Sequence, residues 1–314
     1  MPPKILVIVG PTASGKTRLA VELAHEWNGE VVSADSMQVY RRMDIGTAKP
    51  TAEEMDGIPH HMIDVADPGE DFSAARYVEM ASACVDEILA RGKLPIVAGG
   101  TGLYIDSLLS GRTFAAFSPD SPLRGELEAE LARLGGAAML AQLAQVDPET
   151  AARLHPNDHK RIVRALEVFR STGRTISQHD RETRALPLRY DALTLSLAFQ
   201  RREDMWARID RRVDEMMAAG LAEEVRALLD SGVPVRCTAM QAIGYKEMAA
   251  ALRGGGDVCA AAEEIKLRSR QYAKRQLTWF RRTEGAKWLF WGPEPDFEAA
   301  CRTSTKYLEE FGLV

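Results

Sequence analysis

The sequence predicts an α/β protein in which a mainly parallel sheet is covered by helices on both faces and interrupted by an all-helical insertion. Three observations support this fold class. An apolar run, Ile5 to Val9, leads directly into the glycine-rich stretch GPTASGKT. Further strand-like runs then alternate with helical patterns, which is typical of a parallel sheet. Between Arg112 and Asp191, however, the strand signal disappears.

The core is expected over residues 1–111 and 192–314, and the helical insertion over residues 112–191. Strand-type runs in the core are Ile5 to Val9, Glu30 to Ser33, Leu94 to Ala98, Leu193 to Phe199 and Lys287 to Trp291. Core helices are predicted over Lys16 to Trp27, Ala74 to Ala90, Asp204 to Ala219, Ala222 to Ser231 and a basic stretch near the C-terminus. Pro119 and Pro122 open the insertion, where helices are predicted over Leu123 to Leu134, Ala137 to Gln145 and Lys160 to Ser171.

The helix over Ala74 to Ala90 illustrates the basis of these assignments. Apolar side chains recur in it at helical spacing. Ser73 is the expected N-cap, because a serine hydroxyl can accept a hydrogen bond from the first turn. Gly92 is expected to end the helix, because glycine adopts the left-handed conformation at low cost.

Composition narrows the class of protein. The 314 residues are 46% hydrophobic and 27% charged, as in ordinary globular proteins. The longest early apolar run is too short for a membrane span, so a cytoplasmic location is expected. Four cysteines lie far apart and form no CxxC pair, which argues against a zinc site or a disulfide framework.

Charge is unevenly distributed although the formal net charge is only −5. The segments His159 to Arg184 and Glu263 to Arg282 are both rich in lysine and arginine, and the second carries interleaved aromatic residues. Such segments are commonly solvated helix faces, but they could also bind nucleic acid.

GPTASGKT matches the P-loop pattern G-x-x-x-x-G-K-[ST] between a strand and a helix, the context that its mechanism requires. The predicted core is therefore P-loop NTPase-like. Backbone N–H groups and the helix N-terminus would surround phosphate oxygens, Lys16 would add a charge, and the Thr17 hydroxyl could bind Mg²⁺. The expected phosphate-binding residues are Gly10, Pro11, Thr12, Ala13, Ser14, Gly15, Lys16 and Thr17.

A second polar motif, SADSMQVY, follows the strand Glu30 to Ser33. Ligands of open α/β sheets bind beyond the carboxyl ends of the strands, so Asp35 is expected near the P-loop. There it could accept a proton from a substrate or hold the water shell of a metal ion. Capping of the following turn is an equally good explanation of this aspartate.

Acidic residues are missing at another place. The strand Leu94 to Ala98 ends in Gly99-Gly100-Thr101-Gly102, where many nucleotide hydrolases have a magnesium-binding aspartate. This weakens a hydrolase interpretation but leaves a small-molecule kinase open. The glycines suggest either close backbone approach to a ligand or a tight strand-to-helix turn. His60-His61 and the pair His155 and His159 lack the third ligand of a metal site, so capping or polar packing is favoured.

An arginine pair is the last candidate feature. In RIDRRVDEM, Arg208 and Arg212 share a helical face away from the apolar positions. Arg208 could pair with Asp204, and Arg211 with Glu215, at i,i+4 spacing. An arginine that faces the P-loop would instead donate two hydrogen bonds to a departing diphosphate.

Seven stretches together resemble the bacterial tRNA dimethylallyltransferase family, also called tRNA isopentenyltransferase. They are GPTASGKT, SADSMQVYRRMDIGTAKP, PHHMIDV, AGGTGLY, RLHPNDHKRIVRALEVF, QAIGYKE and RQYAKRQLTWFRR, in the order of the family and over nearly the whole chain. The resemblance implies transfer of a dimethylallyl group from dimethylallyl diphosphate to N6 of adenosine 37, next to the anticodon, in tRNAs that read codons beginning with U. Mg²⁺ as cofactor and a monomeric enzyme are also expected.

The resemblance also implies roles for individual residues. Asp35 would be the general base on the adenine amine, while Lys16, Thr101 and Arg208 would serve the diphosphate side of the reaction. Contacts with the tRNA anticodon stem-loop would come from Asp35, Ser36, Met37, Gln38, Thr101, Arg124, His159, Lys160, Arg161, Ile162 and Val163. The alternatives are a P-loop kinase that uses ATP on a small metabolite and a non-catalytic RNA-binding module.

Overall fold

The computed structural model describes residues 2–111 and 122–314, so the predicted opening of the insertion at Arg112 and Pro119 lies outside the described residues. The side chain of Arg184 lies outside them as well. The described chain divides into two compact units. An α/β unit contains residues 1–109 and 189–314, and a helical unit contains residues 110–188.

The α/β unit is built on a six-stranded sheet of order β3-β2-β4-β1-β5-β6, in which every neighbouring pair is parallel. Its strands are β1 Lys4–Val9, β2 Gly29–Ser33, β3 His60–His61, β4 Leu94–Gly99, β5 Asp191–Phe199 and β6 Lys287–Trp291. All five strands expected from the apolar runs are confirmed. The two-residue strand β3 was not expected.

Side chains of the central strand alternate between two cores. Ile5, Val7 and Val9 belong to one apolar cluster, and Leu6 and Ile8 belong to the other. All five are fully buried or nearly so. A strand buried on both faces favours apolar residues on both, which is why the sequence of β1 shows a continuous apolar run rather than an alternating one.

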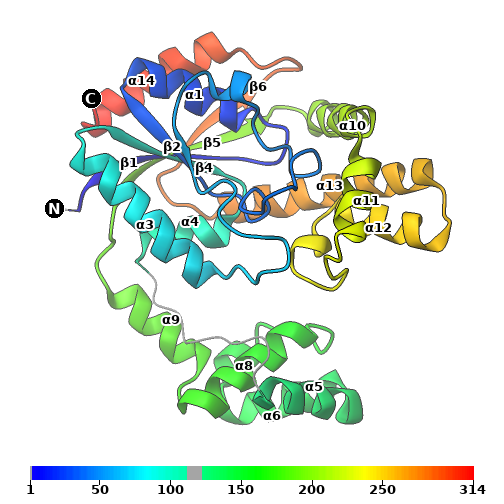
Figure 1. Cartoon of the computed structure of the whole chain (residues 1–314). Coiled ribbons are helices and arrows are strands. Elements are labelled where there is room, and N and C mark those ends of the chain that lie inside the picture. The colour runs from blue at the N-terminus through cyan, green and yellow to red at the C-terminus, as the bar shows by residue number, and fades with distance from the viewer. Residues whose placement is uncertain (1, 112–121) are drawn as a thin grey trace. The chain divides into compact units, whose positions relative to one another are not determined.

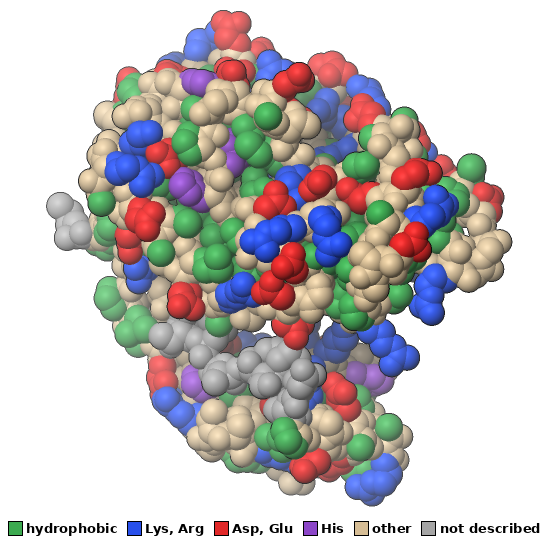
Figure 2. Space-filling view, in the orientation of Figure 1, with side chains coloured by type: hydrophobic (Ala, Val, Ile, Leu, Met, Phe, Trp, Pro, Cys, Tyr) green, Lys and Arg blue, Asp and Glu red, His purple; other side chains and the backbone are tan. Residues whose placement is uncertain are grey.

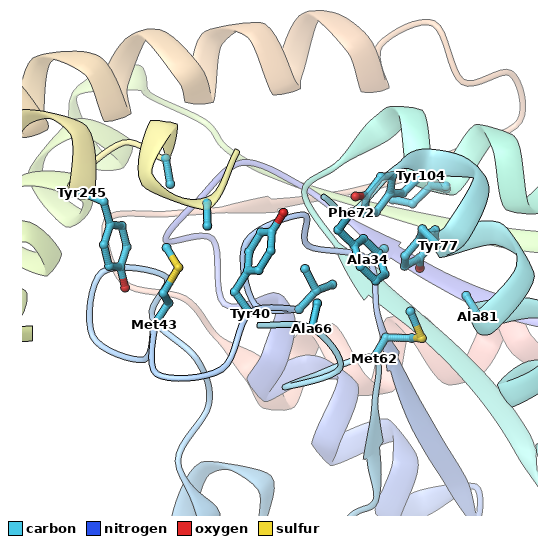
Figure 3. Packing of buried hydrophobic residues seen from close by; sticks show 14 of the residues in the cluster. Ala34, Tyr40, Met43, Met62, Ala66, Phe72, Tyr77, Ala81, Tyr104 and Tyr245 are labelled. Carbon is cyan, nitrogen blue, oxygen red and sulfur yellow. The ribbon is translucent and has the colours of Figure 1, made fainter. Parts of the chain in front are cut away.

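Helices cover both faces of this sheet (Figure 1). On one face lie α1 Lys16–Glu26 and α14 Phe297–Phe311, and on the other lie α3 Ala74–Ala90 and α4 Gly102–Leu109 (Figure 1). Ser73 caps α3 as predicted, since its Oγ accepts from the Arg76 N–H at 3.2 Å. Gly92 follows the helix end with a φ of 69°. The aromatic side of the α3 and α4 core, with Tyr77 and Tyr104, is seen in Figure 3.

The remaining helices of this unit follow β5, apart from the short α2 Ala52–Met55. They are α10 Arg202–Ala218, α11 Leu221–Asp230, the 3₁₀ turn η1 Ala239–Gln241, α12 Tyr245–Gly254 and α13 Val258–Phe280. The predicted α10, α11 and basic C-terminal helix α13 are confirmed. Helices α2, α4, α12 and α14 were not predicted, although the start of α4 at Gly102 agrees with the strand-to-helix turn suggested for the glycine stretch.

The helical unit has its own small core. It contains α5 Pro122–Leu134, α6 Gly136–Val146, α7 Pro148–Ala151, α8 His159–Thr172 and α9 Ile176–Ala185. Leu127, Met139, Leu143 and Ile162 are fully buried together. Across the described residues of both units, no helix has the length and apolarity needed to cross a membrane.

Candidate active site

The P-loop connects β1 to the N-terminus of α1 through two glycines with different roles. A Cβ on Gly10 would lie 2.9 Å from the carbonyl oxygen of Leu197 on the neighbouring strand β5. Gly15 has a φ of 81°, and a Cβ there would lie 2.6 Å from the ring of Phe297. Both positions therefore require glycine, the first for close approach and the second for backbone conformation as well.

Lys16 lies within this loop and has an unusual electrostatic environment. Its Nζ donates a hydrogen bond to the carbonyl oxygen of Pro11 at 2.8 Å. Burial, together with the positive charge of Arg212, lowers the pKa of Lys16 to about 8, against the opposing effect of Asp35. An ammonium held in such a place gains strongly from a bound anion.

A cavity of about 720 Å³ opens beside the P-loop. Side chains of both charge signs line it: Lys16, Arg18, Asp35, Asp44, Lys49, Glu54, Arg208, Arg211, Arg212 and Glu215. A second cavity of about 320 Å³ shares Thr12, Asp35, Arg212 and Tyr272 with the first, and is more apolar through Met37, Ile209, Val213, Ile243 and Ile265. Asp35 lines both cavities, so one ligand could present its phosphates to one cavity and an apolar group to the other.

Asp35 is placed by its own turn. Its Oδ1 accepts from the backbone N–H of Met37 at 2.8 Å, as expected for a capping aspartate. Among the described residues, no hydrogen bond occupies Oδ2. Asp35 therefore both caps the turn and lines the two cavities.

Thr101 fixes this turn to the end of β4. Its Oγ1 accepts from the Ser36 N–H at 3.0 Å and donates to Ser36 Oγ at 3.3 Å. Gly99 permits the approach, because a Cβ on it would lie 2.2 Å from the carbonyl oxygen of Ala34. The structure thus places Thr101 in contact with the segment from Asp35 to Gln38. Gln38 itself bonds within the protein, to Ser33 Oγ and to the carbonyl oxygen of Ala48.

The i,i+4 ion pairs that the spacing allowed on α10, Asp204 with Arg208 and Arg211 with Glu215, do not form among the described residues. Arg208 does not pair with Asp204 among the described residues; its Nε donates to the carbonyl oxygen of Ala13 in the P-loop at 3.2 Å, and its Nη1 lies 3.6 Å from Glu294. Arg212, one turn further, reaches Thr12 Oγ1 at 3.5 Å. Both arginines therefore face the phosphate loop, as the alternative interpretation required.

Three site residues were not predicted. Gln276, on α13, accepts from the Thr12 N–H and donates to the carbonyl oxygen of Gly100. Tyr272, one helical turn earlier, lines both cavities, and burial raises its pKa to about 12, so it stays protonated. Arg212 shares a helical face with Arg208, but the family resemblance implies a role for Arg208 alone. The stretch RQYAKRQLTWFRR contained two of these three residues, but nothing in it marked which side chains face the P-loop.

In the helical unit, the candidate nucleic-acid residues differ in exposure. Ile162 and Val163 are 0% and 2% exposed and pack into the unit's core, so their side chains cannot contact a ligand. The burial of these two side chains therefore contradicts the expectation that they contact tRNA. Lys160 and Arg161 are exposed on the same helix, whereas Arg124 contacts Glu128 and Glu167.

Most other basic side chains of this unit form ion pairs within it. Arg170 pairs with Glu130, Arg174 with Glu182 and Arg181 with Glu149. Lys160 and Arg161 have no such partner among the described residues. On the face seen in Figure 2, acidic and basic side chains are likewise interspersed.

The histidines form polar contacts. His61 Nε2 lies 2.7 Å from Glu30, and His60 Nδ1 lies 2.9 Å from the carbonyl oxygen of Ile58. Over residues 2–111 and 122–314, no three His, Cys, Asp or Glu side chains form a metal-binding group. Thr17 lines the larger cavity beside Lys16, so its hydroxyl is available to an ion that is held chiefly by phosphate oxygens.

The fold and the site together define an α/β protein with a P-loop. Arg208, Arg212 and Asp35 lie beside this loop, whereas the end of β4 lacks the magnesium-binding aspartate that many nucleotide hydrolases have there. A family model described as IPP transferase matches residues 38–283. The tRNA dimethylallyltransferase of Acetivibrio thermocellus is 45% identical over 98% of both chains, and that of Geobacter sulfurreducens is 50% identical over 91% of both. The crystal structure of the full-length tRNA isopentenylpyrophosphate transferase of Bacillus halodurans matches with a TM-score of 0.71 and 42% identity, covering 98% of both chains. The chain belongs to the IPP transferase family.

Proposed function

We propose that this protein transfers a dimethylallyl group from dimethylallyl diphosphate to N6 of adenosine 37 in tRNA, releasing diphosphate. The observation that carries the proposal is the position of Asp35, which lines both the charged cavity of the P-loop and the more apolar cavity. The first cavity suits a diphosphate. The second suits a five-carbon tail that meets an adenine.

In the proposed reaction, the N6 lone pair forms a bond to C1 of the allyl group. The C1–O bond breaks, and its electron pair leaves with the diphosphate. The proton of N6 passes to the Asp35 carboxylate. An exocyclic amine is a weak nucleophile because its lone pair is delocalised into the ring, so a positioned base contributes about 10²- to 10⁴-fold.

The leaving diphosphate gains negative charge as this bond breaks. Lys16, the backbone N–H groups of the P-loop, Arg208 and Arg212 are preorganised donors for that charge. Thr17 and the diphosphate oxygens would hold Mg²⁺. When bound, the ion would neutralise part of the diphosphate charge.

The tRNA would supply a base that is taken out of its stack, since an adenine cannot reach a cavity while stacked on its neighbours. Ser36, Met37 and Thr101 lie beside Asp35 and would contact the flipped nucleotide. In the helical unit, Lys160 and Arg161 would bind tRNA phosphates, with His159 and Arg124 nearby in the same unit.

A P-loop kinase would use the same loop to hold ATP and would use Asp35 on a hydroxyl group. Incubation with dimethylallyl diphosphate, ATP and unmodified tRNA, each labelled in turn, separates the two activities. We expect allyl label in tRNA and no phosphoryl transfer. Phosphate label from ATP in a small product, with no allyl label in tRNA, would contradict the proposal.

A further inference from the structure

Glu224, a half-buried carboxylate, binds the backbone of a loop that lines both cavities of the proposed active site. The wall loop, residues 44–48, contributes Asp44, Ile45, Thr47 and Ala48 to the larger cavity. It also contributes Gly46, Thr47 and Ala48 to the smaller one. Glu224 lies in the first turn of α11 and, among the described residues, lines neither cavity.

Each carboxylate oxygen of Glu224 accepts two hydrogen bonds. Its Oε2 accepts from the backbone N–H groups of Asp44 and Ile45, each at 2.8 Å. Its Oε1 accepts from the Gly46 N–H at 3.1 Å and from the Tyr245 hydroxyl at 2.5 Å. Three successive N–H groups that converge on one carboxylate form a backbone anion site, filled here by the protein's own side chain.

Tyr245, the first residue of α12, contacts both Glu224 and the wall loop. It is fully buried. Burial and the nearby Glu224 carboxylate raise its pKa far above the ordinary value, so the phenol stays protonated and donates. Its ring lies so close to the wall loop that a Cβ on Gly46 would be 2.5 Å from it. Figure 3 shows the Tyr245 ring beside Met43, the residue that precedes the loop.

The other end of the wall loop contacts the proposed active site directly. The carbonyl oxygen of Ala48 accepts from Gln38 Nε2 at 3.1 Å and from Arg212 Nη2 at 3.4 Å. Ala48 has a φ of 46°, a left-handed conformation that alanine adopts only when its surroundings impose it. A change in the position of residues 44–46 would therefore reach Gln38 and Arg212 through a short, constrained stretch of chain.

We propose that Glu224 is a positioning residue for transfer: with Tyr245, it fixes the wall loop and thereby the place of Gln38 and Arg212 beside the allylic diphosphate. The inference rests on the proposed function for the identity of that substrate. Glu224 itself does not touch the reacting groups.

The test compares Glu224→Gln with Tyr245→Phe and with the control Glu223→Gln. Glutamine keeps the size of the side chain but turns an N–H group toward backbone donors. Tyr245→Phe removes one donor and leaves the backbone contacts. Glu223 is on the same turn but is exposed, and within the described part of the chain its ion-pair partner is Arg226 at 3.9 Å.

For Glu224→Gln we expect the KM for dimethylallyl diphosphate to rise about tenfold or more, as misplacement of a positioned group does, while the tRNA Kd stays within about twofold. Tyr245→Phe should raise KM about threefold, consistent with loss of one charge-assisted hydrogen bond among several. Hydrogen exchange of the Asp44 to Gly46 amides should accelerate in both variants. Glu223→Gln should match the wild type in every respect.

A merely structural role would reduce the folded fraction and kcat but leave KM unchanged in the fraction that is active, and this result would overturn the inference. Should Glu224→Gln not fold, Tyr245→Phe decides alone on the same criterion. Binding of inorganic diphosphate to the same variants needs no turnover. If the wild type does not alkylate tRNA, the proposed function fails, whereas unchanged diphosphate affinity and unchanged amide exchange in the variants overturn the role of Glu224.

Discussion

Gln276 and Thr12 join the C-terminal helix α13 to the phosphate loop: Gln276 Oε1 accepts from the Thr12 N–H at 2.9 Å, and its Nε2 donates to the carbonyl oxygen of Gly100 at 3.0 Å. Gln276 is only 6% exposed. A Cβ on Gly100 would lie 2.2 Å from Nε2, so the glycine leaves room for this amide. One side chain therefore sets the spacing between the P-loop and the end of β4.

Replacement of Gln276 by leucine is expected to destabilise the protein by about 1–3 kcal/mol, since the half-buried Thr12 N–H and the buried Gly100 carbonyl lose their partner. Denaturant unfolding measures the difference. Gln271→Leu, at an exposed position of the same helix, is the control and should change stability little. Equal effects of the two substitutions would show that the Thr12 bridge does not matter for stability.

Asp35→Asn should lower the single-turnover rate of transfer by about 10²- to 10⁴-fold while leaving the tRNA Kd nearly unchanged. An asparagine Oδ1 can still accept from Met37, so the turn is kept and only the base is lost. The control is Asp67→Asn, whose carboxylate pairs with Arg41. An unchanged rate in Asp35→Asn would remove Asp35 from the mechanism.

The kcat/KM for the allylic diphosphate should decline as pH rises above about 8, the pKa of Lys16 in the free protein. The sign follows from the charged form: below this pKa the ammonium is present for the diphosphate, and above it the amine is neutral. Tyr272, with a pKa near 12, does not contribute in this range. In Lys16→Arg the residual activity should lose this decline, because arginine stays charged. A wild-type profile that stays flat well above pH 8 contradicts the assignment.

Joint replacement of Lys160 and Arg161 by alanine should weaken tRNA binding and reduce the magnitude of its salt slope by about one to two, the change expected for two lost phosphate contacts. The matched control replaces Arg174 and Arg181, which already form ion pairs with Glu182 and Glu149. Binding measured across a salt series distinguishes the two. The same slope in both double variants would mean that Lys160 and Arg161 are simply solvated.

Sequence reasoning predicted the parts of the fold that depend on local pattern. The central strands β1 and β4 are nearly continuous apolar runs because both of their faces are buried, and Ser73 marks the start of α3 by ordinary capping chemistry. Strand β3 was not predictable, since its two residues, His60 and His61, show no strand pattern. They form a strand by pairing with Val31 and Val32 of β2.

Within the candidate site, the P-loop and Asp35 were predictable because their positions follow from strand ends. Gln276 was not, since helix α13 has 23 residues and its sequence does not show which side faces Thr12. Whether Arg208 pairs with Asp204 or faces the P-loop was likewise open, because helical spacing alone allows both arrangements. Ile162 and Val163 show the converse: the motif around them is basic, but these two positions belong to the buried face of α8.

In the proposed reaction, the P-loop holds a diphosphate that leaves, while the group attached to it is transferred. A donor labelled with ¹⁴C in the allyl group and ³²P in the diphosphate tests this directly, with unmodified tRNA as acceptor. We expect ¹⁴C in tRNA, on the N6 amine of adenosine 37, and an equal amount of ³²P released as free diphosphate. Phosphorus label in tRNA, or diphosphate release without carbon transfer, would contradict the account.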